Sequence, residues 1–269
     1  MNLLLRVLSG AVLLGVLVAA LWAGMPWVAA VVAVAALVGA WEFGGLARAM
    51  GLAPSAWILY PLTLWLALRF AFPAAYQAAD WPLIAAVTVG LMGVVAVSRS
   101  LRGWAAALAG GLYIGFGLGF FVALYGWHAV DSSHFGLRLV ALPLLAVFAG
   151  DTAAYFVGTA IGRHRFFAAI SPKKTVEGAV AGAAATILVA ALAGPALTGL
   201  STAAAAGLGA LVAVAAQGGD LVESAFKREA GAKNSSGLIP GHGGLLDRLD
   251  SLVLVGPIVY CYLKLLSFT

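Results

Sequence analysis

Long apolar stretches alternate with short polar segments along almost the whole chain. A helix needs about 20 consecutive apolar residues to cross a lipid bilayer, and nine stretches approach that length. Backbone groups inside lipid must find hydrogen-bond partners within their own segment, and no alternating strand pattern is present, so we expect helices. The sequence therefore predicts an all-α polytopic membrane protein with nine transmembrane helices, over residues 7–24, 26–45, 55–72, 81–98, 104–127, 137–160, 177–198, 202–226 and 251–267.

The first apolar stretch follows Arg6 and ends in small residues, a pattern that also occurs in cleaved signal peptides. Because it is long and further apolar stretches follow at once, we interpret it as a retained helix. The chain, residues 1–269, is then a single polytopic membrane unit. Within it we distinguish N-terminal helices over 1–103 from C-terminal catalytic helices and cytoplasmic loops over 104–269.

The composition supports this class of protein, because 63% of the residues are hydrophobic and only 9% are charged. With nine spans and a cytoplasmic N-terminus, twelve of the 15 lysines and arginines fall in inside segments and three in outside segments. This bias predicts that the polar loops face the cytoplasm and that the C-terminus lies outside. The net charge of +5 then belongs to loops beside anionic lipid and does not indicate a nucleic-acid-binding protein.

A polar island at residues 220–251 stands out from this apolar background, because it holds nine of the 25 charged side chains. Acids flank a cluster of bases, and the glycine-rich turn Pro240-Gly241-His242-Gly243-Gly244 follows. Carboxylates suit a hard cation, bases suit phosphate, and glycines allow close backbone approach. Together these residue types favour phosphoryl-type chemistry.

Acidic residues in this island are candidates for a metal site. Asp220, Glu223 and Lys227 share one helical face. Asp220 lies deepest in its apolar stretch, where a carboxylate needs a partner or an ion, whereas a Glu223–Lys227 pair is equally compatible with a structural role. Asp247 and Asp250 begin the last predicted helix, and Asp250 can simply cap it. We predict that the intervening loop brings Asp220 and Asp247 together as an oxygen-ligand site for Mg²⁺.

Two other residue types add little to this site. His242 can contact a phosphate or a nucleotide, although a single histidine is more often structural. Cys261 is the one cysteine of the chain, so neither an internal disulfide nor a cysteine-rich metal site is expected.

A second polar segment surrounds the end of the predicted helix at 137–160. Asp151 lies within that apolar helix, where a charge is costly and usually marks a functional or paired site. The loop Ser171-Pro172-Lys173-Lys174-Thr175 precedes a helix that we expect to begin near Val176, with Thr175 as its N-cap. Two lysines beside the exposed N–H groups of a helix start suit a triphosphate or a lipid phosphate. The alternative is a cytoplasmic loop that is merely basic.

Taken together, these segments resemble the signature of the phosphatidate cytidylyltransferase (CDP-diacylglycerol synthase) family. The resemblance is carried by Ser224-Ala225-Phe226-Lys227-Arg228, by Lys233, by the turn at 240–244 and by Asp247-Arg248-Leu249-Asp250. Asp151, Tyr155, the 171–178 segment and the 219–224 segment fit the same family. The resemblance is close in the C-terminal part of the chain, and the first five predicted helices match only in general hydropathy.

The resemblance implies a reaction of CTP with phosphatidic acid that yields CDP-diacylglycerol and pyrophosphate. It further implies Mg²⁺, a second and monovalent cation such as K⁺, a homodimer, and an active site that faces the cytoplasm from the inner (plasma) membrane of a bacterium. The catalytic residues would be Asp220, Asp247, Lys227 and Arg228, the first two as metal ligands. Substrate binding would fall to Asp151, Ser171, Lys173, Lys174, Thr175, Glu223, Lys233, His242, Gly243, Gly244, Arg248 and Asp250.

Two positions depart from the family pattern. Asn234 stands where the family has Asp, which keeps an oxygen ligand but removes a charge, so metal affinity or a local ion pair is affected. Val176 stands where the family commonly has Trp.

Two other functions are compatible with parts of the sequence. An ion-coupled transporter also uses acids within membrane helices, but here the charges gather at the cytoplasmic helix ends. A cytidylyltransferase or kinase that acts on another lipid, such as an isoprenoid, would share the polar clusters and differ in its lipid acceptor.

Overall fold

The computed structural model describes residues 3–72, 81–94, 100–127 and 134–267. Every regular element among these residues is helical, and the β pairing found there consists of two isolated bridges, Arg165–Thr175 and Ile239–Gly243. The predicted all-α class is therefore confirmed for the described residues. Arg99 and the end of the predicted span at 81–98 lie outside them.

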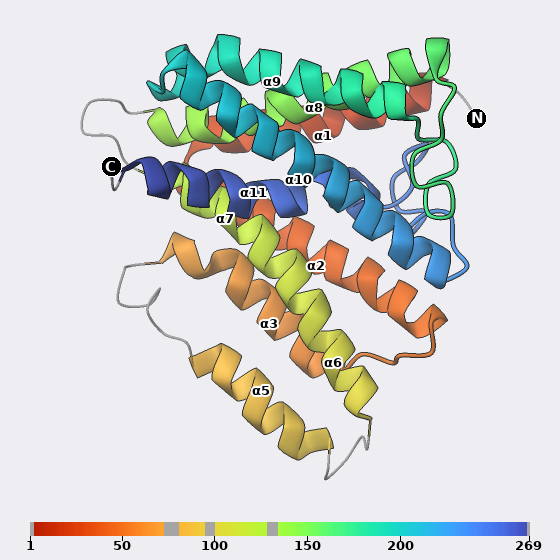
Figure 1. Cartoon of the computed structure of the whole chain (residues 1–269). Helices are drawn as coiled ribbons and strands as arrows, with labels where there is room; N and C mark the ends of the chain where they lie inside the picture. Colours follow the sequence, from red (N-terminus) through yellow and green to blue (C-terminus); the bar gives the residue numbers. More distant parts are fainter. Residues whose placement is uncertain (1–2, 73–80, 95–99, 128–133, 268–269) are drawn as a thin grey trace. The chain divides into compact units, whose positions relative to one another are not determined.

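The helices follow one another along the chain as Figure 1 shows. They are α1 (Leu3–Ala23), α2 (Met25–Ala49), α3 (Ala56–Leu68), η1 (Arg69–Ala71), α5 (Trp81–Gly93), α6 (Leu101–Gly110), η3 (Gly111–Phe116), α7 (Gly117–Tyr125), α8 (Phe135–Ile161), α9 (Val176–Thr198), α10 (Thr202–Glu229) and α11 (Leu246–Ser267). The η3 segment is a π-helix, and it joins α6 and α7 into one continuous apolar stretch.

Six helical stretches in the described part of the chain are long and apolar enough to cross a membrane. They are α2, the joined α6–η3–α7 stretch, α8, α9, α10 and α11. Three shorter apolar helices lie at Val7–Ala23, Ala56–Ala71 and Ile84–Gly93. These findings agree with a polytopic membrane protein, while the number of nine spans and the orientation of the termini stay predictions.

Helix ends fall close to the boundaries expected from the sequence. Gly24 separates α1 from α2 with a φ of 103°, a conformation that glycine adopts without steric cost. The α9 helix begins at Val176 with Thr175 as its N-cap, as predicted, and the Thr175 hydroxyl accepts a backbone N–H of the first turn at 3.2 Å. The α11 helix begins at Leu246, ahead of the predicted span at 251–267.

The chain divides into two compact units. Unit 1 consists of Met1–Gly126 and Phe226–Leu249, and unit 2 consists of Trp127–Ala225 and Asp250–Thr269. Unit 1 thus holds helices α1 to α7 with the end of α10 and the first turn of α11, and unit 2 holds α8, α9 and the remaining parts of α10 and α11. The predicted division into residues 1–103 and 104–269 stays a prediction.

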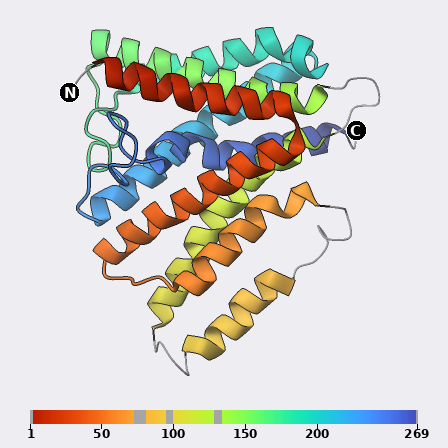
Figure 2. The ribbon, with the colours of Figure 1, turned by 180° about the vertical axis from the view of Figure 1, so that it is seen from behind.

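In unit 1, α3 packs against α2, α5 and the α6–η3–α7 stretch, which run side by side in both views (Figures 1 and 2). Gly111, Gly115 and Gly119, spaced four residues apart, face α3. A Cβ atom on Gly115 would lie 2.8 Å from the Cα atom of Thr63. Small residues at this spacing therefore let the two backbones approach closely, as in other membrane helix pairs.

In unit 2, α8 and α9 pack against each other along their length (Figure 1). Glycines again allow the approach, since a Cβ atom on Gly178 would lie 2.7 Å from the carbonyl oxygen of Ala154, and one on Gly182 would lie 3.0 Å from that of Gly150. This close pairing holds the connecting loop, residues 162–175, at one end of the two helices.

Candidate active site

The loop between α8 and α9 is folded by its own backbone hydrogen bonds. The Phe166 N–H donates to the Lys174 carbonyl at 3.0 Å, and the Lys174 N–H donates to the Ser171 carbonyl at 3.2 Å. Thr175 then caps α9 and is buried. The side chain of Lys173 is exposed, and that of Lys174 is directed toward α10.

Lys174 and Asp220 form an ion pair in unit 2. The Nζ atom of Lys174 lies 2.7 Å from Oδ2 of Asp220, and the Ser224 hydroxyl donates to Oδ1 of the same carboxylate at 3.2 Å. The two charged side chains are 25% and 33% exposed, so an anionic ligand can reach the lysine. The structure thus brings together a lysine predicted to bind phosphate and an acid predicted to bind metal.

Three further predicted residues lie elsewhere in unit 2. Glu223 is fully buried on α10, whereas Asp151 is exposed on α8. Asp250 is partly buried, and a Cβ atom on Gly219 would clash with its carbonyl oxygen. Within this unit, α11 therefore crosses α10 one residue from Asp220, which brings the backbone of Asp250 close to that acid.

Lys227 and Asp247 form a second ion pair, in unit 1. The Nζ atom of Lys227 donates to Oδ1 of Asp247 at 2.7 Å, and the side chains are only 11% and 5% exposed. Oδ2 of Asp247 accepts the Ser235 N–H at 2.9 Å, the Ser235 hydroxyl at 3.0 Å and the Gly244 N–H at 2.8 Å. The carboxylate is therefore held at both oxygens by a lysine, a loop and a turn.

The glycine-rich turn needs its glycines for two reasons. Gly241 and Gly243 both have a φ of 81°, in the left-handed region. A Cβ atom on Gly243 would also lie 2.7 Å from Oδ2 of Asp247 and 3.3 Å from Cγ of Asn234. We expected these glycines to admit phosphate oxygens, and in the structure they admit a carboxylate of the protein. Asn234, the residue that stands where the family has Asp, therefore lies beside the same turn.

Alanine at position 244 is expected to destabilise unit 1. A Cβ atom on Gly244 would clash with Oγ of Ser235 and lie 2.5 Å from Oε1 of Glu42, so the turn must move. Such overpacking costs about 1–3 kcal/mol. Thermal unfolding should show a lower midpoint for Gly244→Ala. Gly237→Ala, in the same loop where a Cβ atom meets nothing within 4 Å, should behave as the unchanged protein; equal midpoints for the two variants would contradict this packing.

Two residues that the sequence argument missed hold this loop. Glu42, on α2, accepts hydrogen bonds from the loop and from the start of α11. Ser9, on α1, places its hydroxyl 2.8 Å from Nδ1 of His242. Glu42 could have been identified from the sequence as a candidate, because it is an acid inside an apolar stretch, as Asp220 is. Ser9 could not have been identified in this way, since serine is common in membrane helices and only the fold places it beside His242.

Three other basic residues of the predicted site, all in unit 1, are accessible. Arg228, Lys233 and Arg248 are all exposed. Arg228 donates from Nη1 to the Ala232 carbonyl at 3.3 Å, which helps to end α10. An anionic ligand can therefore reach three cations of the unit that holds the buried Lys227–Asp247 pair.

The predicted magnesium ligands lie in different units, Asp220 in unit 2 and Asp247 in unit 1. Among the described residues, no three His, Cys, Asp or Glu side chains are grouped so that they could hold a metal ion. Asp220 fits a metal ligand, because it is partly exposed and each of its oxygens has one partner. In Asp247, Oδ2 already accepts three hydrogen bonds, so Oδ1 is the atom that fits.

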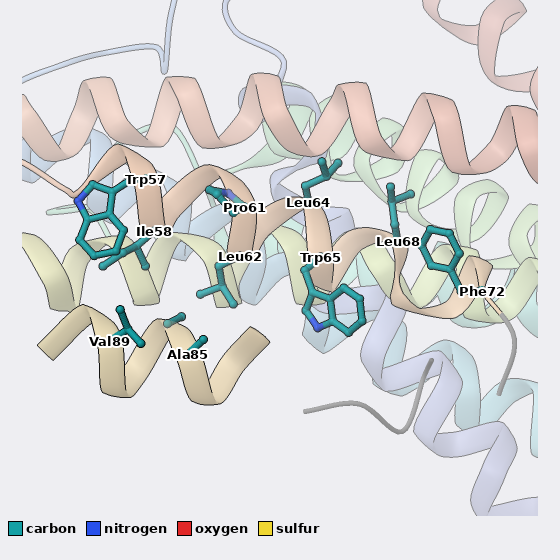
Figure 3. Close-up of a pocket in the computed structure, with 11 residues that line it drawn as sticks. Trp57, Ile58, Pro61, Leu62, Leu64, Trp65, Leu68, Phe72, Ala85 and Val89 are labelled. Atoms are coloured by element: carbon teal, nitrogen blue, oxygen red, sulfur yellow. The ribbon is translucent and has the colours of Figure 1, made fainter. Parts of the chain in front are cut away.

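An apolar pocket of about 510 Å³ lies between α3 and α5 (Figure 3). Trp57, Trp65, Phe72 and Val89 are among its lining residues. None of the lining residues is charged, and none belongs to the predicted site. Binding sites for polar substrates need a few convergent polar groups, so we do not assign the phosphoryl chemistry to this pocket.

Both ion pairs join an acid to a lysine near the end of a membrane-type helix, and each lies beside a loop that exposes further cations. Together with the six long apolar helical stretches in the described residues, these features define an integral membrane protein.

The chain belongs to the cytidylyltransferase family, whose model matches residues 4–266. It is 32% identical to the phosphatidate cytidylyltransferase of a Synechocystis species, and the match covers 97% of this chain and 96% of that protein. The phosphatidate cytidylyltransferase of Brucella suis is 39% identical over 61% of this chain and 58% of its own length. The phosphatidate cytidylyltransferase of Bacillus subtilis is 37% identical over 58% of this chain and 56% of its own length. The resemblance found in the sequence is confirmed.

Proposed function

We propose that this chain transfers the cytidylyl group of CTP to phosphatidic acid and releases CDP-diacylglycerol and pyrophosphate. One observation carries the proposal: the chain matches, nearly end to end, a Synechocystis protein named phosphatidate cytidylyltransferase. The two acid–lysine pairs support it, because they place cations beside helix ends where the head group of a lipid and a water-soluble nucleotide can meet.

The reaction joins two anions. An oxygen of the phosphatidate phosphate forms a bond to the α-phosphorus of CTP, and the bond from that phosphorus to the bridging oxygen breaks, so that pyrophosphate leaves. The attacking phosphate is already ionised at neutral pH, so charge repulsion is a larger obstacle than proton removal. Side chains that hold both phosphates close together and in line lower this barrier.

The cationic side chains have distinct roles in this proposal. In unit 2, Lys173 and Lys174 bind phosphate at the start of α9, where the polar loop at 171–175 adds hydroxyl and N–H donors. In unit 1, Arg228, Lys233 and Arg248 neutralise the leaving pyrophosphate or the lipid phosphate. Lys227 acts from a fixed position, because Asp247 holds its ammonium group. His242, Gly243 and Gly244 shape the turn beside them, and Asp151, Glu223 and Asp250 stay proposed substrate-binding residues.

Magnesium is the proposed cofactor, with Asp220 and Asp247 as its protein ligands and a monovalent cation such as K⁺ nearby. When bound, Mg²⁺ neutralises triphosphate charge, and it typically takes one or two carboxylates together with substrate phosphates.

We also propose nine transmembrane helices, a cytoplasmic N-terminus, an outside C-terminus and a homodimer in the inner membrane of a bacterium. The six long apolar stretches and the three shorter apolar helices in the described residues support nine spans. The excess of lysine and arginine in the inside segments supports an active site that faces the cytoplasm, where CTP is found.

Pyrophosphate release from CTP tests the proposal. Purified full-length protein in mixed micelles should release pyrophosphate only when phosphatidic acid and Mg²⁺ are both present, with CDP-diacylglycerol as the lipid product. Activity with an isoprenoid phosphate in place of phosphatidic acid would identify a different lipid acceptor. Solute flux in proteoliposomes without CTP turnover would replace the proposal with a transporter.

The variant Asn234→Asp extends the same assay. If well-folded protein releases no pyrophosphate, Asn234→Asp restores the acid of the family pattern beside Gly243. Activity gained by this variant would attribute the inactivity to the missing charge, whereas continued inactivity would overturn the assignment of phosphatidic acid as the acceptor.

A further inference from the structure

Glu42 is the most deeply buried acid among the described residues of unit 1. It lies on α2 and is only 1% exposed. A carboxylate so far from solvent is costly unless several donors satisfy it. The donors come from three residues of the segment between α10 and α11 and from the first N–H of α11.

Each oxygen of Glu42 accepts from one backbone N–H and lies within hydrogen-bond distance of one hydroxyl. Oε1 accepts from the Ser236 hydroxyl at 2.5 Å and from the Leu245 N–H at 2.9 Å. Oε2 accepts from the Leu246 N–H at 2.5 Å and lies 3.2 Å from the Ser235 hydroxyl, whose single hydrogen is shared between Glu42 and Oδ2 of Asp247. The first N–H groups of a helix have no partner within it, so Glu42 acts as an N-cap of α11 supplied by another helix.

These contacts connect Glu42 to Asp247. Ser235, whose hydroxyl donates to Glu42, also donates its N–H to Oδ2 of Asp247 at 2.9 Å. Gly244, which donates to the same Oδ2 atom, would place a Cβ atom 2.5 Å from Oε1 of Glu42. Glu42 therefore lies against Ser235 and Gly244, the two residues that hold Oδ2 of Asp247.

We propose that Glu42 is a positioning residue, which fixes the first turn of α11 and thereby the orientation of the Asp247 carboxylate and its Lys227 partner. This inference rests on the proposed function, because it assigns Asp247 and Lys227 to the reacting site. The inference also specifies what α2 must supply: one buried side chain with two hydrogen-bond acceptor oxygens.

Glutamine at position 42 isolates this requirement. Gln has the shape of Glu, but one of its two terminal groups is an NH₂ donor. Either orientation of the amide points this donor at the N–H of Leu245 or of Leu246. A hydroxyl can rotate and accept from the amide, but a backbone N–H cannot. Glu42→Gln should therefore release one end of the α11 cap although no space is created.

The experiment compares Glu42→Gln with Glu229→Gln, which removes the same charge from an exposed position of unit 1. We expect kcat, per folded molecule, to fall by about tenfold or more in Glu42→Gln, because a buried donor loses its acceptor. The KM for CTP and the half-saturating Mg²⁺ concentration should rise, because Asp247 is displaced. Glu229→Gln should match the unchanged protein. A loss of folded protein alone would lower the maximal rate and leave both constants unchanged.

Hydrogen exchange gives a readout that does not depend on turnover. Peptides that cover residues 241–249 should exchange faster in Glu42→Gln than in Glu229→Gln, while peptides from α8 and α9 should exchange equally. If the unchanged protein releases no pyrophosphate, the proposed function fails, and exchange at residues 241–249 still decides whether Glu42 holds the turn. Unchanged exchange together with unchanged kinetic constants would overturn the inference.

A second variant covers the case in which Glu42→Gln does not fold. Ser236→Ala keeps the carboxylate and removes one of its hydroxyl donors. It should raise exchange at residues 241–249 and lower kcat by a smaller factor, about threefold, since a single neutral donor is lost. Wild-type exchange and wild-type kcat in Ser236→Ala would also count against a positioning role.

Discussion

Asparagine in place of Asp247 is expected to reduce both turnover and stability. The substitution leaves the Lys227 ammonium, only 11% exposed, without its carboxylate. Breaking a buried pair by removing one partner costs about 3–5 kcal/mol, because an uncompensated charge stays buried. The new NH₂ group also faces donors, since Lys227, Ser235 and Gly244 all donate to the present carboxylate. We expect pyrophosphate release to fall by at least about 100-fold, and denaturant unfolding in detergent to show the lost free energy.

A double variant separates the two effects. Lys227→Met combined with Asp247→Asn removes the buried charge together with its partner, so stability should recover to a large extent. Activity should not recover, because both groups that are proposed to act in the site are gone. Full activity in Asp247→Asn, or a double variant as unstable as the single one, would show that the pair does not have the role proposed here.

The same substitution at Asp220 is expected to reduce turnover and leave stability nearly unchanged. Asp220 and its partner Lys174 are 33% and 25% exposed, so water can solvate the lysine once the carboxylate is neutral. Ion pairs of this kind contribute about 0–1 kcal/mol. As a proposed metal ligand, however, Asp220 should matter for catalysis, and Asp220→Asn should lower pyrophosphate release by about 100-fold or more.

The comparison of Asp220→Asn with Asp247→Asn is the sharper test, because the chemistry of the change is identical. Unfolding midpoints and Mg²⁺ titrations measured side by side would distinguish a stability effect from a metal effect. Excess Mg²⁺ should restore part of the activity of Asp220→Asn. A large loss of stability in this variant, or turnover equal to that of the unchanged protein, would remove Asp220 from the proposed role.

Much of the architecture could be predicted because it depends on local patterns. Apolar stretches predicted the helices, and the position of Thr175 predicted the N-cap of α9. The polar residues of the family signature could be named because they are close together in the sequence. Their pairing could not be predicted. The metal site shared by Asp220 and Asp247 stays a prediction, and no pattern in the sequence indicated that the two acids form ion pairs with Lys174 and Lys227.

Glu42 and Ser9 show the limit of the sequence argument more clearly. Each contacts the segment that precedes α11 from an N-terminal helix in which the sequence analysis recognised only general hydropathy. Tertiary hydrogen bonds of this kind depend on which helices become neighbours, and the pattern of apolar residues along the chain does not predict which helices those are. A rule that treats every acid inside an apolar stretch as a candidate would have included Glu42 beside Asp151 and Asp220.

The distance along the chain between Glu42 and its donors has a consequence for biosynthesis. Ser235 is 193 residues away and Leu245 is 203 residues away. A ribosome therefore delivers α2 to the membrane long before it makes the groups that satisfy this carboxylate. Until then, the Glu42 carboxylate has none of these donors, although a bare charge in lipid is costly. Nascent chains that stop before residue 235 should consequently be recognised by membrane quality control as unfinished.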